Sequence, residues 1–143
     1  MADWEHAGRA CMIAEINAMA NGDPVNLGYL MGSNYTRGFP VPVREFNQNF
    51  LALPALPSKV VKGACSDSEV VLREIDCSKL GVTAKYYALV HIGLKEKCDV
   101  KVAIHGVKGE VEFVANGKTS PLKDGVLEFK TLKPLQLIAI KAK

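Results

Sequence analysis

Three carboxylates in the first third of this 143-residue chain have the chemistry for acid–base catalysis, namely Glu15, Asp23 and Glu45. Paired carboxylates about 5 to 10 Å apart can cleave a glycosidic bond. The local sequence favours a structural role for each of the three. Glu15 lies inside a predicted helix, Asp23 belongs to a helix stop, and Glu45 lies near the start of a second helix, where the helix dipole favours a negative charge. We therefore predict no catalytic residue in this chain.

The histidines and cysteines do not have the spacing of a catalytic or metal site. They are scattered along the chain at His6, His91, His105, Cys11, Cys65, Cys77 and Cys98. They form neither a CxxC pair nor a Cys/His arrangement, and the chain has no Gly-x-Ser-x-Gly elbow. We therefore predict no metal and no cofactor. His91 is expected on a strand, opposite in phase to Val90 and Ile92, and His105 is expected in a turn.

The cysteines are expected to be free thiols. A predicted strand separates Cys65 from Cys77 and, when extended, holds them about 20 Å apart, which is beyond the reach of a disulfide. Cys98 alternates in phase with Val100 and Val102, so we predict a buried thiol there. Cys11 lies among apolar neighbours in a helix, so we predict a buried thiol there as well.

Two helices are predicted ahead of any long strand. Asp3 can cap a helix that runs to about Ala20, and residues 21–24 (NGDP) stop it, because glycine accepts a left-handed backbone and proline cannot continue a helix. This helix is apolar nearly all round, which predicts neighbours on several sides. A second helix begins near Pro42 and ends before Pro54, and its apolar residues recur on one face at Val43, Phe46, Phe50 and Leu53.

From Lys59 onward, apolar and polar residues alternate with a period of two, which is typical of strands. Six segments show the pattern: residues 70–75, 84–92, 98–104, 110–115, 126–131 and 135–141. Turn signals such as Asn116-Gly117 and Asp124-Gly125 separate them. We predict a mainly β fold, an antiparallel β-sandwich over residues 58–143, preceded by two helices within residues 1–57 and a linker at residues 55–58.

Three segments of the front part carry a resemblance to a known architecture: residues 14–24 (AEINAMANGDP), 28–38 (GYLMGSNYTRG) and 44–57 (REFNQNFLALPALP). Together with the strands that follow, they resemble the C-terminal end of a bacterial glycoside hydrolase. In such an enzyme the last strand and helix of a (β/α)8 barrel precede a β-sandwich. Most of the barrel is absent from this chain, which would supply only one strand and two helices of it.

The resemblance implies a place for the loop that carries Asn34, Tyr35 and Arg37. In the parent enzyme this loop would follow a barrel strand and face the active site. There Tyr35 would stack on a sugar ring, and Arg37 would bond to hydroxyl groups or to a carboxylate. The alternative is a loop that packs under the sandwich. Residues 34–36 also match a glycosylation sequon, but the bacterial resemblance argues against its use.

We interpret the chain as a non-catalytic accessory region whose sandwich supports a catalytic barrel that is not present here. A carbohydrate-binding module and a small stand-alone glycosidase are the alternatives. Binding modules usually present exposed rings, whereas Tyr86 and Tyr87 must point to opposite faces of their strand. Phe113 and Phe129 share the inward phase of the sandwich core. The strand region is therefore poorly supplied for an aromatic platform.

The composition fits a globular protein, with 48% apolar and 23% charged residues. The net charge of +3 is spread without a basic block, which argues against nucleic acid as a partner. No apolar run approaches the roughly 18 residues of a membrane span, and the first residues lack a signal-peptide pattern. We expect a soluble chain, from a parent that is periplasmic or secreted if a missing front part holds an export signal. The expected partners are the missing barrel or a second copy, bound through Trp4, Met12 and Ile16 of the first helix.

Overall fold

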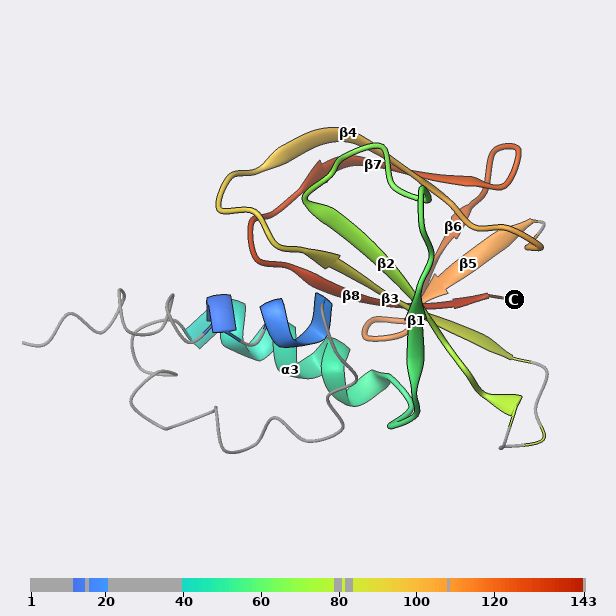
Figure 1. Cartoon of the computed structure of the whole chain (residues 1–143), viewed down its shortest axis with the longest axis horizontal. Helices are drawn as coiled ribbons and strands as arrows, with labels where there is room; N and C mark the ends of the chain where they lie inside the picture. The colour runs from blue at the N-terminus through green and yellow to red at the C-terminus, as the bar shows by residue number, and fades with distance from the viewer. Residues whose placement is uncertain are drawn as a thin grey trace, which may run out of the picture.

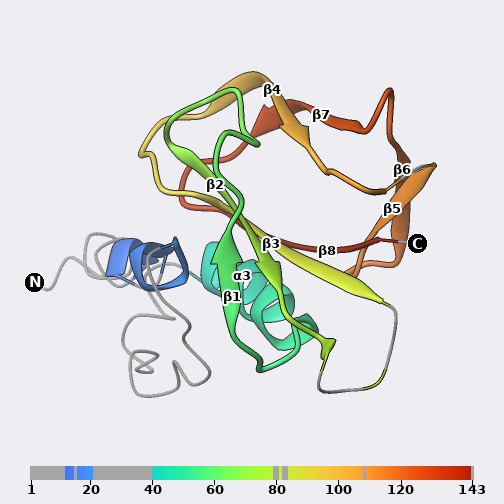
Figure 2. The same ribbon diagram turned by 45° about the vertical axis from the view of Figure 1, so that its right-hand side comes forward.

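The computed structural model describes residues 12–14, 16–20, 40–78, 81, 84–107 and 109–142 (Figures 1 and 2). Residues 12–14 and 16–20 are helical, and the helix α3 spans Pro40–Ala52. Eight strands follow: β1 (Ser58–Val60), β2 (Val70–Ile75), β3 (Lys85–His91), β4 (Lys97–Ala103), β5 (Glu110–Phe113), β6 (Lys118–Pro121), β7 (Val126–Leu132) and β8 (Leu137–Ala142). The predicted mainly β fold with helical residues in its front part is confirmed.

The strands form two antiparallel sheets. The larger sheet has six strands in the order β1-β2-β3-β8-β5-β6, and the smaller sheet pairs β4 with β7. Every pair of neighbouring strands is antiparallel. Figure 1 shows β4 and β7 on one side of the larger sheet, with α3 and the helical residues on the other side. The larger sheet is therefore covered on both faces.

The main core lies between the two sheets. The larger sheet contributes Leu72, Leu89 and Ile140, and the smaller sheet contributes Val102 and Leu127, all of them buried. The alternation of strand residues explains this division, because every second side chain points to the same face. Residues 87–91 of β3 are all buried, since the side chains between the core positions point to the helical layer.

Tight turns join several strands where the sequence predicts them. Gly117, with a φ of 72°, lies in the β5–β6 hairpin, and its amide donates to Phe113 O (2.8 Å). Asp124 and Gly125 both have positive φ angles, 54° and 76°, in the turn that leads into β7. This backbone is the type that Asp-Gly pairs favour in tight hairpins. The turn chemistry of the chain is therefore readable from its sequence.

Two short strands of the structure were not predicted. β6 has the sequence KTSP, which lacks the apolar alternation of a strand. β1 begins at Ser58, inside the predicted linker, and Ser58 pairs with Ile75 of β2. Both are edge strands, so few of their side chains need to be apolar. The division into separate units at residue 57 stays a prediction.

The predicted burial of Cys98 is wrong, because its side chain is exposed. Asp99 has a φ of 54°, which is unusual for a residue other than glycine. After Asp99, Val100 and Val102 point into the core. Before Asp99, the inward position moves by one residue, because Leu132, which pairs with Lys97, is buried. The period-two pattern therefore does not extend across Asp99.

Candidate functional site

The outer face of the six-stranded sheet holds the helical layer, and we call it the helix-docking face. It is formed by Val71 and Arg73 of β2, Ala88 and Val90 of β3, and Leu137 of β8. Met12, Ile16 and Phe46 of the helical part are almost completely buried in the same cluster, with exposed fractions of 1%, 0% and 2%. The helix-docking face therefore joins residues far apart in the sequence.

The helical layer packs here because its apolar side chains recur on one side. Phe46 and Phe50, one turn apart on α3, stack with their ring centroids 6.0 Å apart. Asn49, on the same helix, completes an otherwise open part of β8. Its Oδ1 accepts a hydrogen bond from the Ala139 amide (2.9 Å), and its Nδ2 donates to Glu45 O (2.9 Å). The sheet and α3 are thus joined by polar as well as apolar contacts.

Arg73 is a buried charge on the helix-docking face, with 7% of its surface exposed. Its guanidinium donates to the carbonyl of Ala20 (3.0 Å) and to the carbonyl (3.1 Å) and hydroxyl (2.8 Å) of Ser58. Ala20 is the last described residue of the helical stretch 16–20, directly before the predicted helix stop. Carbonyls in the last turn of a helix lack intrahelical partners and attract cations. Arg73 therefore ties the helical layer to β1 and β2.

The strand phase of Arg73 is a sequence signal for a buried charge, although Arg73 belongs to no motif. Arg73 of β2 (VVLREI) is in phase with Val71, which packs on the helical layer, whereas the other charged residue of the strand, Glu74, is exposed. A charged residue in the buried phase of a strand must find partners, because an isolated buried charge is strongly unfavourable. The partners themselves, 15 and 53 residues away in the sequence, could not be predicted from spacing.

His91 is a buried histidine at the end of β3, with 1% of its surface exposed. Its Nδ1 lies 2.6 Å from the carbonyl of Lys133, so Nδ1 must carry the hydrogen. Its Nε2 has no hydrogen-bond partner among the described residues. The His91 amide also donates to Gln136 O (2.8 Å). His91 thus anchors the connection between β7 and β8.

Close packing surrounds the Nε2 atom of His91. A side-chain carbon added at Gly93 would lie 2.8 Å from this atom and 2.7 Å from Glu69 Oε2. Glu69 in turn bonds to Lys97 Nζ through its other oxygen (2.8 Å). There is no room between His91 and Gly93 for a ligand, so we assign His91 a structural role. The strand position of His91 is as predicted.

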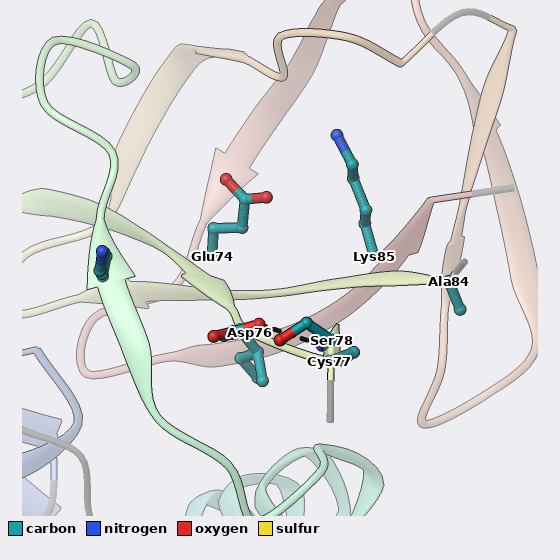
Figure 3. A pocket seen from close by; sticks show the side chains of 8 residues that line it. Glu74, Asp76, Cys77, Ser78, Ala84 and Lys85 are labelled. Carbon is teal, nitrogen blue, oxygen red and sulfur yellow. Dashed lines mark hydrogen bonds between the residues drawn. The ribbon is translucent and has the colours of Figure 1, made fainter. Parts of the chain in front are cut away.

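A hollow of about 380 Å³ opens beside β1, β2 and β3. It is lined by Lys59, Glu74, Ile75, Asp76, Cys77, Ser78, Ala84 and Lys85. Figure 3 shows Glu74 and Lys85 rising on one side of the strands, with Asp76 beside Ser78, whose amide donates to Asp76 Oδ1 (3.0 Å). Burial raises the pKa of the Cys77 thiol. Its nucleophilic thiolate form is therefore suppressed near neutral pH.

A second hollow is lined by residues of α3, of the end of β5, of β7 and of β8, and we call it the α3–β7 groove. Its volume is about 390 Å³, and its lining is Glu45, Gln48, Asn49, Phe113, Ala115, Asn116, Phe129, Thr131, Lys133, Gln136 and Ile138. The rings of Phe113 and Phe129 lie 6.0 Å apart at a tilt of 49°. Lys133 Nζ and Glu45 Oε1 are 3.5 Å apart at its rim. The groove thus combines aromatic rings with amide and charged groups.

The predicted substrate-binding residues Asn34, Tyr35 and Arg37 lie outside the described residues, as do His6, Cys11, Glu15 and Asp23. Of the remaining candidates, Glu45 lies in α3 and His105 lies in an exposed turn, as predicted. Cys65, Cys77 and Cys98 are free thiols. Within the described ranges, no group of three or more His, Cys, Asp or Glu residues could hold a metal ion.

The aromatic residues of the strand region are mostly engaged in packing. Tyr87 is buried in the main core, and burial together with the nearby Glu74 raises its pKa to about 12. Tyr86 is half-buried, with Lys141 Nζ 5.6 Å from its ring centroid. Phe113 and Phe129 pack against the main core, which confirms their inward phase. These rings do not form an exposed platform.

No protein-family model matches this chain, and no curated protein matches its sequence. Two solved structures show a partial likeness. Both are of a GH27 β-L-arabinopyranosidase from Geobacillus stearothermophilus, one the wild type and the other a variant in complex with arabinose. Each is 16% identical to this chain, with a TM-score of 0.47, over 61% of this chain and 19% of the enzyme. A likeness this low establishes neither a family nor an activity.

No helix in the described part of the chain is both long enough and apolar enough to cross a membrane.

Proposed function

We propose that this chain is a non-catalytic structural β-domain that holds the helical end of a preceding domain, as the accessory sandwich of a glycoside hydrolase-like protein would. The observation that carries the proposal is the helix-docking face. On this face, the outer side of the six-stranded sheet buries Met12, Ile16 and Phe46, and Arg73 bonds to Ala20 O. One face of this sheet packs in the main core and the other face packs against the helical layer. A sheet of this kind is suited to joining two parts of a protein.

The charged contacts support the same role. An arginine that bonds to three oxygens from two separate segments fixes the orientation of the segments as well as their distance. Apolar contacts alone would allow the helical layer to slide on the sheet. The helix-docking face therefore has the features of a permanent junction, with a buried apolar centre and a satisfied polar group.

The enzymatic alternative is tested by incubating the purified full chain with a panel of aryl glycosides that covers the common sugars. We expect no release of the aryl group above the buffer rate for any of them. Hydrolysis at an enzyme-like rate of about 1 s⁻¹ or more would contradict the proposal. The double variant E15Q/D23N would then show whether the predicted carboxylates carry that activity.

A second candidate function, binding of a neutral saccharide, is favoured by the α3–β7 groove. Asn116 Oδ1 and Gln136 Oε1 accept backbone hydrogen bonds from Lys118 and Lys133, and their amide nitrogens have no partner among the described residues. Phe113 and Phe129 are only partly buried where they line the groove, so they add a small apolar surface beside these amides. Side-chain amides and aromatic rings suit a hydroxyl-rich ligand more than a charged one.

A glycan array followed by calorimetry tests this second candidate. Binding should weaken about tenfold or more in Gln136→Ala, while Tyr86→Ala, which lies outside the groove, should bind like the wild type. If no glycan binds, or if the two variants behave alike, the groove is not a saccharide site.

A further inference from the structure

The described residues leave three strands with one edge unpaired, and these edges differ in how well they are protected. β1 has three residues, and β6 has four and ends at Pro121. Short edge strands and prolines prevent pairing with another chain. β7 has seven residues without a proline, and its neighbour in the sheet is β4. The edge of β7 is therefore the longest one open to pairing.

The other edge of the small sheet is already occupied. Residues 64–66 run along β4, where Ala103 N donates to Ala64 O (2.8 Å) and Ser66 N donates to Lys101 O (2.9 Å). Lys101 and Ala103 thus point their backbone groups away from β7. Their neighbours Val100 and Val102 must then bond to β7, because residues along a strand alternate between its two edges. Val100 and Val102 lie opposite Phe129 and Leu127.

The same alternation fixes which groups of β7 face its open edge. Val126 exchanges two hydrogen bonds with Lys123, both of 3.0 Å, on the side away from β4. Two residues further on, Glu128 must direct its backbone N–H and C=O groups to this side as well, and the same alternation continued through Phe129 places those of Lys130 there. The side chains of Glu128 and Lys130 are both exposed. The open edge therefore presents an acidic and a basic residue on either side of Phe129.

We propose that two copies of this chain pair through their β7 edges, antiparallel, about a twofold axis at Phe129. In this register Glu128 of each copy lies opposite Lys130 of the other. The pair exchanges two backbone hydrogen bonds, and the opposite charges attract on the same face of the sheet. Because a twofold axis repeats every contact, the pairing has four backbone hydrogen bonds and two charge pairs. The two small sheets become one sheet of four strands.

The aromatic residues beside the edge support a second copy as the occupant. Phe129 and Phe113 are both only partly buried in the single chain, and they line the α3–β7 groove next to the edge. The axis would bring Phe129 of the partner copy directly opposite Phe129. Residues opposite each other in a pair without hydrogen bonds are the closest across an antiparallel ladder. The pairing would therefore cover apolar surface that the chain leaves exposed.

Sedimentation velocity of the full chain over a wide concentration range tests the proposal. We expect a dimer whose dissociation constant rises at least about tenfold in Glu128→Lys and in Lys130→Glu, since each change places like charges opposite each other twice. The double swap E128K/K130E restores opposite charges and should restore the dimer. Lys118→Glu on β6, which makes the same charge change on another edge, is the matched control and should dimerise normally.

Oxidative cross-linking provides a second measurement that does not depend on charge. Cα atoms opposite each other in a pair without hydrogen bonds are about 4.5 Å apart, which a disulfide can span. Phe129→Cys should form a disulfide-linked dimer that the wild type, with its exposed Cys98, does not form. A monomeric wild type at all concentrations, a dimer indifferent to the charge reversals, or a double swap that fails to rescue would each overturn the proposal.

Discussion

Arg73 is the residue on which the junction between sheet and helical layer depends most. Arg73→Met keeps the length and packing of the side chain but removes every donor, leaving the Ala20 and Ser58 carbonyls without their bonds. We expect the free energy of unfolding to fall by about 2–4 kcal/mol, because buried polar groups that lose a partner are costly. Urea denaturation measures the change.

Arg44→Met is the matched control for this prediction. Arg44 lies on α3 but is exposed, so its loss should change the stability by less than about 0.5 kcal/mol. An Arg73→Met protein as stable as the control would show that the guanidinium contacts contribute nothing to the junction.

Tyr87 gives the fold a dependence on alkaline pH. Its pKa is raised from 10.0 to about 12, mainly by burial and in part by Glu74. Between these two values the unfolded chain loses the phenolic proton while the folded chain keeps it. Stability from this group is therefore complete below pH 10 and is lost as the pH rises towards 12.

Tyr87→Phe isolates this effect, because it removes the ionisable group and keeps the ring in the core. We expect the wild type to lose on the order of 2 kcal/mol more than Tyr87→Phe between these pH limits. Cys65, whose pKa burial raises to about 11, contributes a similar loss to both proteins and cancels in the comparison. Equal pH profiles of the two proteins would exclude an energetic role for the hydroxyl.

At the scale of elements, α3 is held to the sheet by one face. Phe46 is buried to 2% exposure, whereas Leu51 on the same helix is 80% exposed. Phe46→Ala should lower the free energy of unfolding by about 3–5 kcal/mol through loss of buried surface and the cavity left behind. Leu51→Ala, measured by the same denaturation, should have an effect below about 0.5 kcal/mol. Similar losses in both variants would mean that α3 is not docked as described.

The elements that were predictable from the sequence are those whose side chains alternate or recur with a clear period. β2, with the sequence VVLREI, has the predicted bounds, and α3 begins two residues before the predicted start at Pro42. β6 was missed because an edge strand of polar residues carries no period. Cys98 was misplaced because a positive φ at Asp99 inverts the phase of β4. Aspartate tolerates this backbone better than most residues, but a single aspartate inside an alternating segment does not by itself predict the change. Backbone irregularities of this kind depend on tertiary packing.

The candidate site was less predictable than the fold. The sequence indicated an apolar first helix in need of neighbours, and the structure supplies the outer face of the six-stranded sheet for its described part. Arg73 bonds to Ser58 and Ala20, which are 15 and 53 residues away in the sequence. Contacts over such separations have no characteristic spacing, so the sequence could not reveal them. Asn34, Tyr35 and Arg37 stay predictions, since they lie outside the described residues.

At the scale of the whole molecule, the six-stranded sheet is the element on which both layers depend. Its inner face forms the main core with β4 and β7, and its outer face binds the helical layer. Figure 2 shows the helical residues beside α3, on the side of the molecule away from β4 and β7. Stability of the helical layer should therefore be coupled to that of the sheet, as expected for a junction and not for an independent appendage.

Amide hydrogen exchange of the full chain tests this coupling most directly. We expect the amides of residues 16–20 and of α3 to be protected in the wild type, and Arg73→Met to reduce protection at residues 16–20 more than at Leu89 in the main core. This result would show a helical layer held by the helix-docking face. Rapid exchange at residues 16–20 in a wild-type protein whose β3 amides are fully protected would contradict the structural role proposed for this chain.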